Sequence, residues 1–189
     1  MNVALRKPMT VEQFSAWEER QELRHEFDGV RPVARPGDTA AHAAIQRNLL
    51  VALAERLRGT LCEPYGSTLK ILVDSRIRYP DAFVVCTPVE PKATVVADPV
   101  VVFEILSESS AHTDLVLKNA EYRACASVLR YVVLEQAQPG VLAFVRKGED
   151  WTAETLGGAD AVMSLPELGI EIPLAEVYEG ALPAPAGEG

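Results

Sequence analysis

The sequence predicts a mixed α/β domain in which helices cover one β-sheet. The first observation behind this is the order of hydrophobic patterns, which runs helix, hairpin, long helix, three strands, helix and further strands. The second is composition, because 48% hydrophobic and 24% charged residues are ordinary for a globular protein. The third is the length of 189 residues, which suits one domain. We expect that domain over residues 1–180, followed by a flexible tail at residues 181–189.

Two helices and a hairpin are predicted in the N-terminal third. A capping-box sequence that begins at Thr10 predicts a helix over residues 10–20. An Asp-Gly pair between two apolar-containing runs predicts a hairpin over residues 24–34. A continuous apolar stripe then predicts a long helix over residues 38–58, which a glycine ends.

Most of the remaining chain is predicted to form β-strands. Apolar runs bounded by turn residues predict strands at residues 67–73, 79–86, 99–106, 129–134, 141–145 and 151–156. A helix over residues 113–126 separates the third strand from the fourth, with Thr113 as its N-cap. A short helix is expected at residues 173–178. This order leaves strands and helices interleaved along the chain.

The cysteines and the N-terminus indicate a cytoplasmic protein. Cys62, Cys86 and Cys125 are odd in number and widely spaced, so we expect reduced thiols and neither a disulfide framework nor a zinc cluster. The N-terminus lacks the apolar core of a signal peptide. No apolar run reaches the ~20 residues of a membrane-spanning helix. We therefore expect no membrane partner.

The net charge of −9 argues against a protein that coats nucleic acid without specificity. It is compatible with an enzyme that binds phosphates through a metal ion and a local group of basic residues, here called a basic rim. Arg76 and Arg78 could form such a rim, or they could be salt-bridged surface groups. The histidines form no zinc-binding motif, and His42 is expected to be solvated or to cap the long helix, although it could line a cleft.

Two acidic residues lie in strands where acids are unusual. Asp81 stands at the start of an apolar strand, and Glu104 is the one polar residue in the run Val100–Leu106. That run predicts a strand buried on both faces. An isolated carboxylate there would cost several kcal/mol to ionise. Glu104 must therefore have a partner, which can be a cation, a proton or a metal ion.

Neighbouring strands lie about 4.8 Å apart, so two carboxylates on one face can reach the same ion. Mg²⁺ prefers oxygen ligands and keeps several waters, so two carboxylates and a carbonyl suffice. In the alternative, Glu104 forms a structural ion pair with a buried Arg or Lys, and Asp81 caps a turn. The strand pattern alone leaves both possibilities open.

A second set of polar residues follows on the next helix. Asp114, Lys118 and Tyr122 are spaced i, i+4 and i+8, so they share one face. An ammonium group beside the acidic strand could hold a water or stabilise charge on a phosphate oxygen. In the alternative, Asp114 and Lys118 form an exposed pair worth about 0.3–0.5 kcal/mol.

With these residues in view, the chain resembles the PD-(D/E)xK nuclease superfamily and, more closely, the Uma-type family of putative restriction endonucleases. The matching segments are residues 9–14, 24–29, 78–81, 102–107 and 174–178, together with Asp114, Lys118 and Tyr122. The resemblance implies a restriction-endonuclease-like fold, with a mixed central β-sheet flanked by helices. Each motif alone is weak, but their order and spacing are specific.

The resemblance also implies roles for the acids. Asp81 and Glu104 would be catalytic and would bind a divalent metal, Mg²⁺ with Mn²⁺ as a substitute. Glu26 matches a further acid of the family and could add a ligand or position a water, or it could simply be solvated. Asp114 and Tyr122 are possible additional site residues.

The lysine of the superfamily normally follows the second acid by two positions, and here that position is Leu106. Lys118 matches the lysine that the Uma-type family presents from the following helix, so it is the expected catalytic lysine. Lys70, in the preceding strand, is the alternative. This departure puts activity in question more than the fold.

The expected function is a Mg²⁺-dependent endonuclease that hydrolyses phosphodiester bonds in DNA and acts as a homodimer. A catalytically inactive module that keeps the nuclease fold for binding is the alternative, and the net charge and Leu106 favour it. A weaker alternative is a metal-dependent hydrolase that acts on RNA or another phosphoester.

Overall fold

The computed structural model describes residues 9–35, 37–107 and 113–182. Its helices are α1 (Val11–Glu18), α2 (Ala40–Leu57), the π-helix η1 (Thr113–Lys118), α3 (Asn119–Ala124) and α4 (Leu174–Val177). The first seven strands are β1 (His25–Phe27), β2 (Pro32–Ala34), β3 (Glu63–Gly66), β4 (Lys70–Val73), β5 (Arg76–Arg78), β6 (Ala82–Val85) and β7 (Val95–Val96). The others are β8 (Val101–Leu106), β9 (Arg130–Glu135), β10 (Gly140–Lys147), β11 (Asp150–Gly157), β12 (Val162–Leu165) and β13 (Ile170–Pro173).

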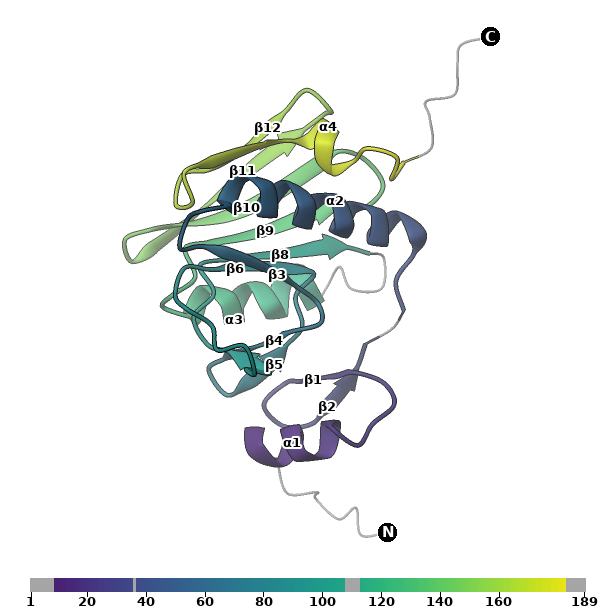
Figure 1. Ribbon diagram of the computed structural model, residues 1–189, viewed down its shortest axis with the longest axis vertical. Coiled ribbons are helices and arrows are strands. Elements are labelled where there is room, and N and C mark those ends of the chain that lie inside the picture. Colours follow the sequence, from purple (N-terminus) through teal and green to yellow (C-terminus); the bar gives the residue numbers. More distant parts are fainter. Residues whose placement is uncertain (1–8, 36, 108–112, 183–189) are drawn as a thin grey trace.

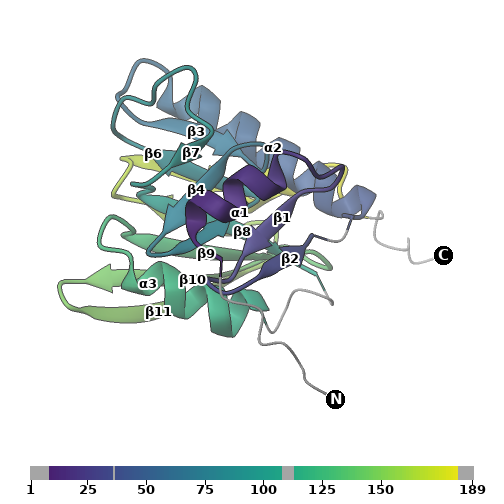
Figure 2. The same ribbon diagram turned by 90° about the horizontal axis from the view of Figure 1, so that it is seen from below.

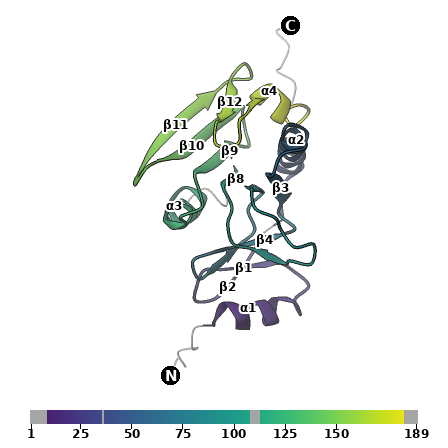
Figure 3. The same cartoon turned by 60° about the vertical axis from the view of Figure 1, so that its left-hand side comes forward.

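A mixed six-stranded sheet forms the centre of the molecule, with strand order β11-β10-β9-β8-β6-β3 (Figure 1). Only β8 and β9 run parallel within it, and the other neighbouring strands of this sheet are antiparallel. Helices α2 and α4 lie on one face of this sheet and α3 on the other, as Figure 3 shows. The larger hydrophobic cluster fills the α2 side and the second cluster fills the α3 side. Because both faces are covered, β8 is buried almost throughout, as its apolar run predicted.

A second sheet carries the N-terminal part of the chain. Its strand order is β2-β1-β5-β4-β7, and α1 packs against it (Figure 2). Phe14 of α1 stacks on Phe27 of β1, with ring centroids 5.0 Å apart, and both belong to a third hydrophobic cluster. The predicted capping box is confirmed, because Thr10 and Gln13 exchange backbone-to-side-chain hydrogen bonds of 3.0 and 3.2 Å.

The expectation of one sheet was wrong, since the described residues form three, the third being β12 with β13. Strands β3, β5, β7, β12 and β13 were not predicted. They are only two to four residues long, too short for a period-2 pattern to stand out. The other predicted helices and strands are present, most with shorter bounds, whereas β9 is shifted by one residue and β10 and β11 are longer than predicted. The helix predicted over residues 113–126 begins as the π-helix η1 and continues as α3.

The expectation of three reduced thiols was also wrong, because Cys62 and Cys86 form a disulfide. In the antiparallel pair β3–β6, Glu63 lies opposite Val85. The next pair along the ladder is therefore Cys62 with Cys86, and their Cα atoms are 3.9 Å apart. The strand β3 that creates this pairing was not visible in the sequence. Cys125 remains a half-buried thiol, 3.3 Å from the hydroxyl of Ser127.

Among the described residues, no helix is both long and apolar enough to cross a membrane. The predicted tail begins at residue 181, and its first two residues, Ala181 and Leu182, pack against the larger hydrophobic cluster. Residues 183–189 lie outside the described part of the chain.

Candidate active site

Strand register brings the two unusual acids together. In the antiparallel pair β6–β8, Ala82 lies opposite Phe103. The ladder therefore places Asp81, just before β6, opposite Glu104 of β8, where facing Cβ atoms are about 4.5–5.5 Å apart. Each acid is only 2% exposed. The predicted proximity of Asp81 and Glu104 is thus a property of the fold.

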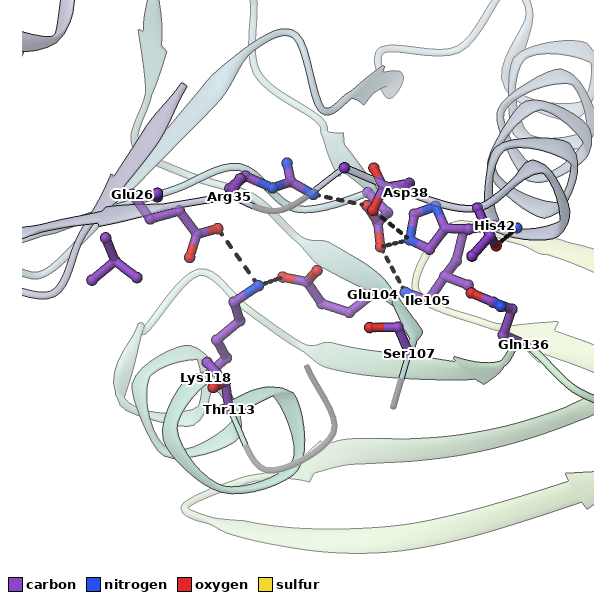
Figure 4. A pocket seen from close by; sticks show the side chains of 15 residues that line it. Glu26, Arg35, Asp38, His42, Glu104, Ile105, Ser107, Thr113, Lys118 and Gln136 are labelled. Carbon is purple, nitrogen blue, oxygen red and sulfur yellow. Dashed lines mark hydrogen bonds and ion pairs between the residues drawn. The ribbon is translucent and has the colours of Figure 1, made fainter. Parts of the chain in front are cut away.

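Both acids line a pocket of about 280 Å³, which Figure 4 shows from close by. Its charged and titratable walls include Glu26, Arg35, Asp38, His42, Asp81, Glu104 and Lys118. These side chains come from β1, from the connection between β2 and α2, from the start of α2, from the residue before β6, from β8 and from η1. Four acidic side chains therefore share a small space with an arginine, a lysine and a histidine.

Glu104 is held by the helix that follows its strand. Lys118 Nζ and the hydroxyl of Tyr122 each donate to Glu104 Oε1 at 2.9 Å. Lys118 also lies 3.5 Å from Glu26 Oε1, so its ammonium stands between two carboxylates (Figure 4). In the metal-free protein Glu104 therefore has the buried lysine that the structural alternative required. Lys118 is itself 6% exposed, so it does not form the exposed pair considered from the sequence.

Asp81 has a different set of partners. Its Oδ2 accepts hydrogen bonds from the backbone N–H of Ile105 at 2.7 Å and from His42 Nε2 at 3.1 Å. Its Oδ1 accepts one from Arg35 Nη2 at 3.2 Å. The Gln46 amide on α2 donates to the backbone carbonyl of Asp81 at 2.8 Å. The start of β6 is thus fixed to α2 through both side chain and backbone.

The contact between Asp81 and His42 shifts the pKa of both side chains. Burial opposes the charge of Asp81, but the hydrogen bond and charge of His42, the Ile105 amide and Arg35 outweigh it and lower the pKa of Asp81. Burial likewise opposes the charge of His42, but the hydrogen bond and charge of Asp81, together with Asp38, raise the pKa of His42 above its ordinary value. The pair is therefore ionic at mildly acidic pH.

We expect an NMR titration of the metal-free protein to give His42 a pKa above the ~6.5 of a free imidazole. In Asp81→Asn that pKa should fall, because burial then acts without the carboxylate. A raised histidine pKa contributes stability that is present below pH ~6.5 and is lost as pH rises through the folded pKa. The lowered Asp81 pKa contributes stability above pH ~3.9 that is lost as pH falls through the folded pKa. A His42 pKa unaffected by Asp81→Asn would contradict the pairing.

Glu26 connects the second sheet to the pocket. It is 6% exposed, so the solvated alternative was wrong. The backbone N–H of Tyr79 donates to Glu26 Oε1 at 3.2 Å, and Arg78 Nη1 donates to its Oε2 at 3.3 Å. Arg78 is also buried and makes two 2.7 Å hydrogen bonds to Glu121 of α3. Arg78 therefore belongs to an internal ion-pair network and not to a basic rim.

Lys70 does not line this pocket. Its Nζ donates to Glu18 Oε2 at 2.8 Å, and the hydroxyl of Tyr79 donates to Glu18 Oε1 at 2.8 Å. Both Lys70 and Glu18 line another pocket beside α1. Tyr122 does reach Glu104, as described above. The side chain of Asp114 lies outside the described part of the chain.

Sequence reasoning set His42 aside and missed Arg35 and Gln46. A signal for His42 existed, since it precedes Ile45 and Leu49 on the buried stripe of α2 at helical spacing. A histidine on such a stripe must find a polar partner. Arg35 lies between β2 and α2, outside any periodic pattern, and no sequence signal distinguished it from other arginines.

The carboxylate oxygens of the pocket suit a hard cation that takes only a few of its ligands from the protein. Within residues 9–35, 37–107 and 113–182, no three His, Cys, Asp or Glu side chains are grouped closely enough to hold a metal by themselves. Mg²⁺ keeps several waters and is usually bound through one or two carboxylates, and Asp81 and Glu104 offer two that face each other. Soft or nitrogen-preferring metals lack the ligands they need here. Asp81 and Glu104 are the residues that would hold the ion.

Comparisons with known proteins agree with the sequence resemblance. An uncharacterized protein of Synechocystis sp., slr1290, is 26% identical over 176 residues, which cover 91% of this chain and 92% of that protein. A crystal structure of a putative nuclease belonging to DUF820 from Anabaena variabilis has a TM-score of 0.76 and 17% sequence identity, covering 93% of this chain and 100% of that one. This likeness shows the fold, so the predicted restriction-endonuclease-like architecture is confirmed. The model of the family described as Uma2, putative restriction endonuclease, matches residues 11–175. This chain, matched over well above half its length, belongs to the Uma2 family of putative restriction endonucleases.

Proposed function

We propose that this protein is a Mg²⁺-dependent endonuclease that hydrolyses phosphodiester bonds in DNA. The observation that carries the proposal is the facing pair of buried carboxylates, Asp81 and Glu104, at a pocket with a buried lysine. Family membership and the nuclease named among the structural relatives support the same reaction class.

Each residue of the pocket has a distinct part in the proposal. Asp81 is held rigidly by the Ile105 amide and His42, so it offers a fixed oxygen ligand. Glu104 lies beside it and brings Lys118 to the pocket. When bound, a divalent cation supplies Lewis-acid polarisation of a phosphate oxygen and a lowered pKa for a bound water. Lys118, with its three donors, orients a water or stabilises negative charge that develops on the phosphate.

The test is incubation of supercoiled plasmid with the purified protein and Mg²⁺ or Mn²⁺. We expect nicked or linear products with either metal, none with EDTA, and a loss of at least about 10³-fold in Asp81→Asn. Calorimetry should show metal binding that Asp81→Asn abolishes. The proposal fails if wild-type protein neither binds the metal nor cleaves.

One observation favours the non-catalytic alternative. Asp81 forms ion pairs with Arg35 and His42, and Glu104 forms one with Lys118, so each acid has a cationic side chain of the protein beside it. A binding module that kept the fold would need no more than these pairs. Metal binding without cleavage of plasmid or of a parallel RNA substrate would favour that module, whereas cleavage of RNA alone would favour the phosphoester alternative.

We also propose that the protein acts as a homodimer. The basis is the resemblance to nucleases in which paired subunits present two sites to two strands. Light scattering at two protein concentrations should give the mass of two 20.5 kDa chains. A monomeric mass at both concentrations would contradict it.

A further inference from the structure

The two oxygens of the Asp81 carboxylate accept hydrogen bonds from partners that differ in how easily they can move away. The partners of Oδ2 are a backbone amide within β8 and the 3% exposed imidazole of His42, neither of which can leave without disturbing the core. The partner of Oδ1 is the guanidinium of Arg35, whose side chain is 20% exposed. Arg35 extends from the connection between β2 and α2, outside both elements. Oδ1 is therefore the oxygen whose partner can be exchanged.

Arg35 lies in a strongly negative setting. Burial disfavours its charge, but the carboxylates of Glu104, Asp81, Glu26 and Asp38 outweigh that effect and raise the pKa of Arg35. Its guanidinium is also anchored elsewhere, because Nη1 donates to the backbone carbonyl of Tyr79 at 2.7 Å. The group can thus give up Asp81 and still stay at the pocket wall (Figure 4).

From this geometry we propose that Arg35 is a positioning residue with two opposed effects: it competes with a divalent cation for Asp81 Oδ1, and once displaced it binds a phosphate of the nucleic acid. The proposal rests on the proposed function. A cation at Oδ1 repels the guanidinium and takes its acceptor. A planar guanidinium with five donors is suited to a phosphate, to which it can make paired hydrogen bonds. Binding of the metal and binding of the phosphate are thereby coupled through the side chain of Arg35.

This proposal predicts changes of opposite sign in one variant. In Arg35→Met the affinity for Mn²⁺, measured by calorimetry without DNA, should rise about tenfold, which is ~1.4 kcal/mol. The affinity for a short fluorescein-labelled DNA duplex, measured by anisotropy at saturating Ca²⁺ so that the cation displaces Arg35 and the DNA stays uncleaved, should fall about tenfold. Arg35→Lys keeps the charge but not the planar fork. It should bind Mn²⁺ about as wild type does and DNA less tightly than wild type.

The matched control is Arg56→Met. Arg56 also pairs with a carboxylate, Glu176 at 2.6 Å, and its side chain is 27% exposed, but it lies on α2 away from the pocket. Neither affinity should change in this variant. Melting curves of all variants show whether the fold is intact.

The outcomes separate this proposal from the proposed function. If wild type binds Mn²⁺ and Arg35→Met binds it equally or more weakly, Arg35 only supports Asp81 and the inference is overturned while the metal site stands. Unchanged DNA affinity in Arg35→Met, or no DNA binding by wild type, overturns the phosphate role. Binding of Mn²⁺ by Arg35→Met but not by wild type supports competition. If neither protein binds Mn²⁺, the inference and the metal-dependent function both fall.

Discussion

Replacing Lys118 with methionine is expected to reduce Mg²⁺-dependent DNA cleavage by about 10²–10⁴-fold, the range found when a positioned proton-transfer or charge-stabilising group is removed. Lys118 Nζ lies 2.9 Å from Glu104 Oε1 and 3.5 Å from Glu26 Oε1, so it is the ammonium group at the acidic pocket. Metal affinity should not fall, because the substitution removes a cation that competes for Glu104. Cleavage rates and calorimetric Mg²⁺ titrations on the same variant check both parts.

The matched control is Lys70→Met. Lys70 is as buried as Lys118 and also pairs with a glutamate, but its partner is Glu18 and its pocket is another one. We expect Lys70→Met to melt at a lower temperature and to keep its cleavage rate per folded molecule. Loss of cleavage in Lys70→Met with retention in Lys118→Met would assign the catalytic lysine to the other sheet. Loss of both cleavage and metal affinity in Lys118→Met would mean that Lys118 holds the pocket together and does not act on the reaction.

Much of the central sheet could be predicted, because β6, β8 and β9 consist largely of buried apolar residues and each acid stands out against that background. Glu104 interrupts an otherwise apolar run, and its need for a partner followed from the energetics of burial alone. The position of Lys118 could not be derived from residue spacing alone. Lys118 ends the π-helix η1, whereas the i, i+4 spacing used in the prediction applies to an α-helix. Lys118 and Tyr122 nevertheless reach the same oxygen of Glu104.

The hairpin β1–β2 and strand β4 were predicted, but strand β5 and the pairing that joins these strands into a second sheet were not, so the environment of Glu26 could not be predicted either. Strand β5 consists of Arg76, Ile77 and Arg78, a polar-apolar-polar triplet too short to separate from a turn. Pairing of β5 with β1 and β4 buries Arg78 to 4% exposure and brings it to Glu26. Non-local pairing of this kind leaves no local periodicity in the sequence. The same reason explains the Cys62–Cys86 disulfide, which depends on strand β3.

The location of Arg78 makes it the residue whose loss should most reduce stability. It contacts Glu26 of β1 and Glu121 of α3 from its own strand β5, so it ties the second sheet to the helix that carries Tyr122. Arg78→Met removes the cation shared by two largely buried carboxylates, so that Glu121 keeps only Arg76 and Glu26 keeps only Lys118 as ion-pair partners among the described residues. Breaking a buried ion pair in this way costs about 3–5 kcal/mol. For a chain of this size that corresponds to a fall in Tm of roughly 6–20 °C in a thermal melt.

Two further variants test whether the stability lost in Arg78→Met comes from the broken ion pairs or from lost packing of the side chain. Arg56→Met breaks an ion pair of comparable geometry between half-exposed partners and should cost about 1 kcal/mol or less. Arg78→Met combined with Glu121→Gln removes one of the two negative charges that lost Arg78 and should recover part of the stability. If the double variant melts no higher than the single one, the aliphatic part of Arg78 accounts for the loss and the charge network does not. Recovery would show that charge balance between Arg78 and its two glutamates, one on β1 and one on α3, stabilises the contact between the second sheet and the helix that carries Tyr122.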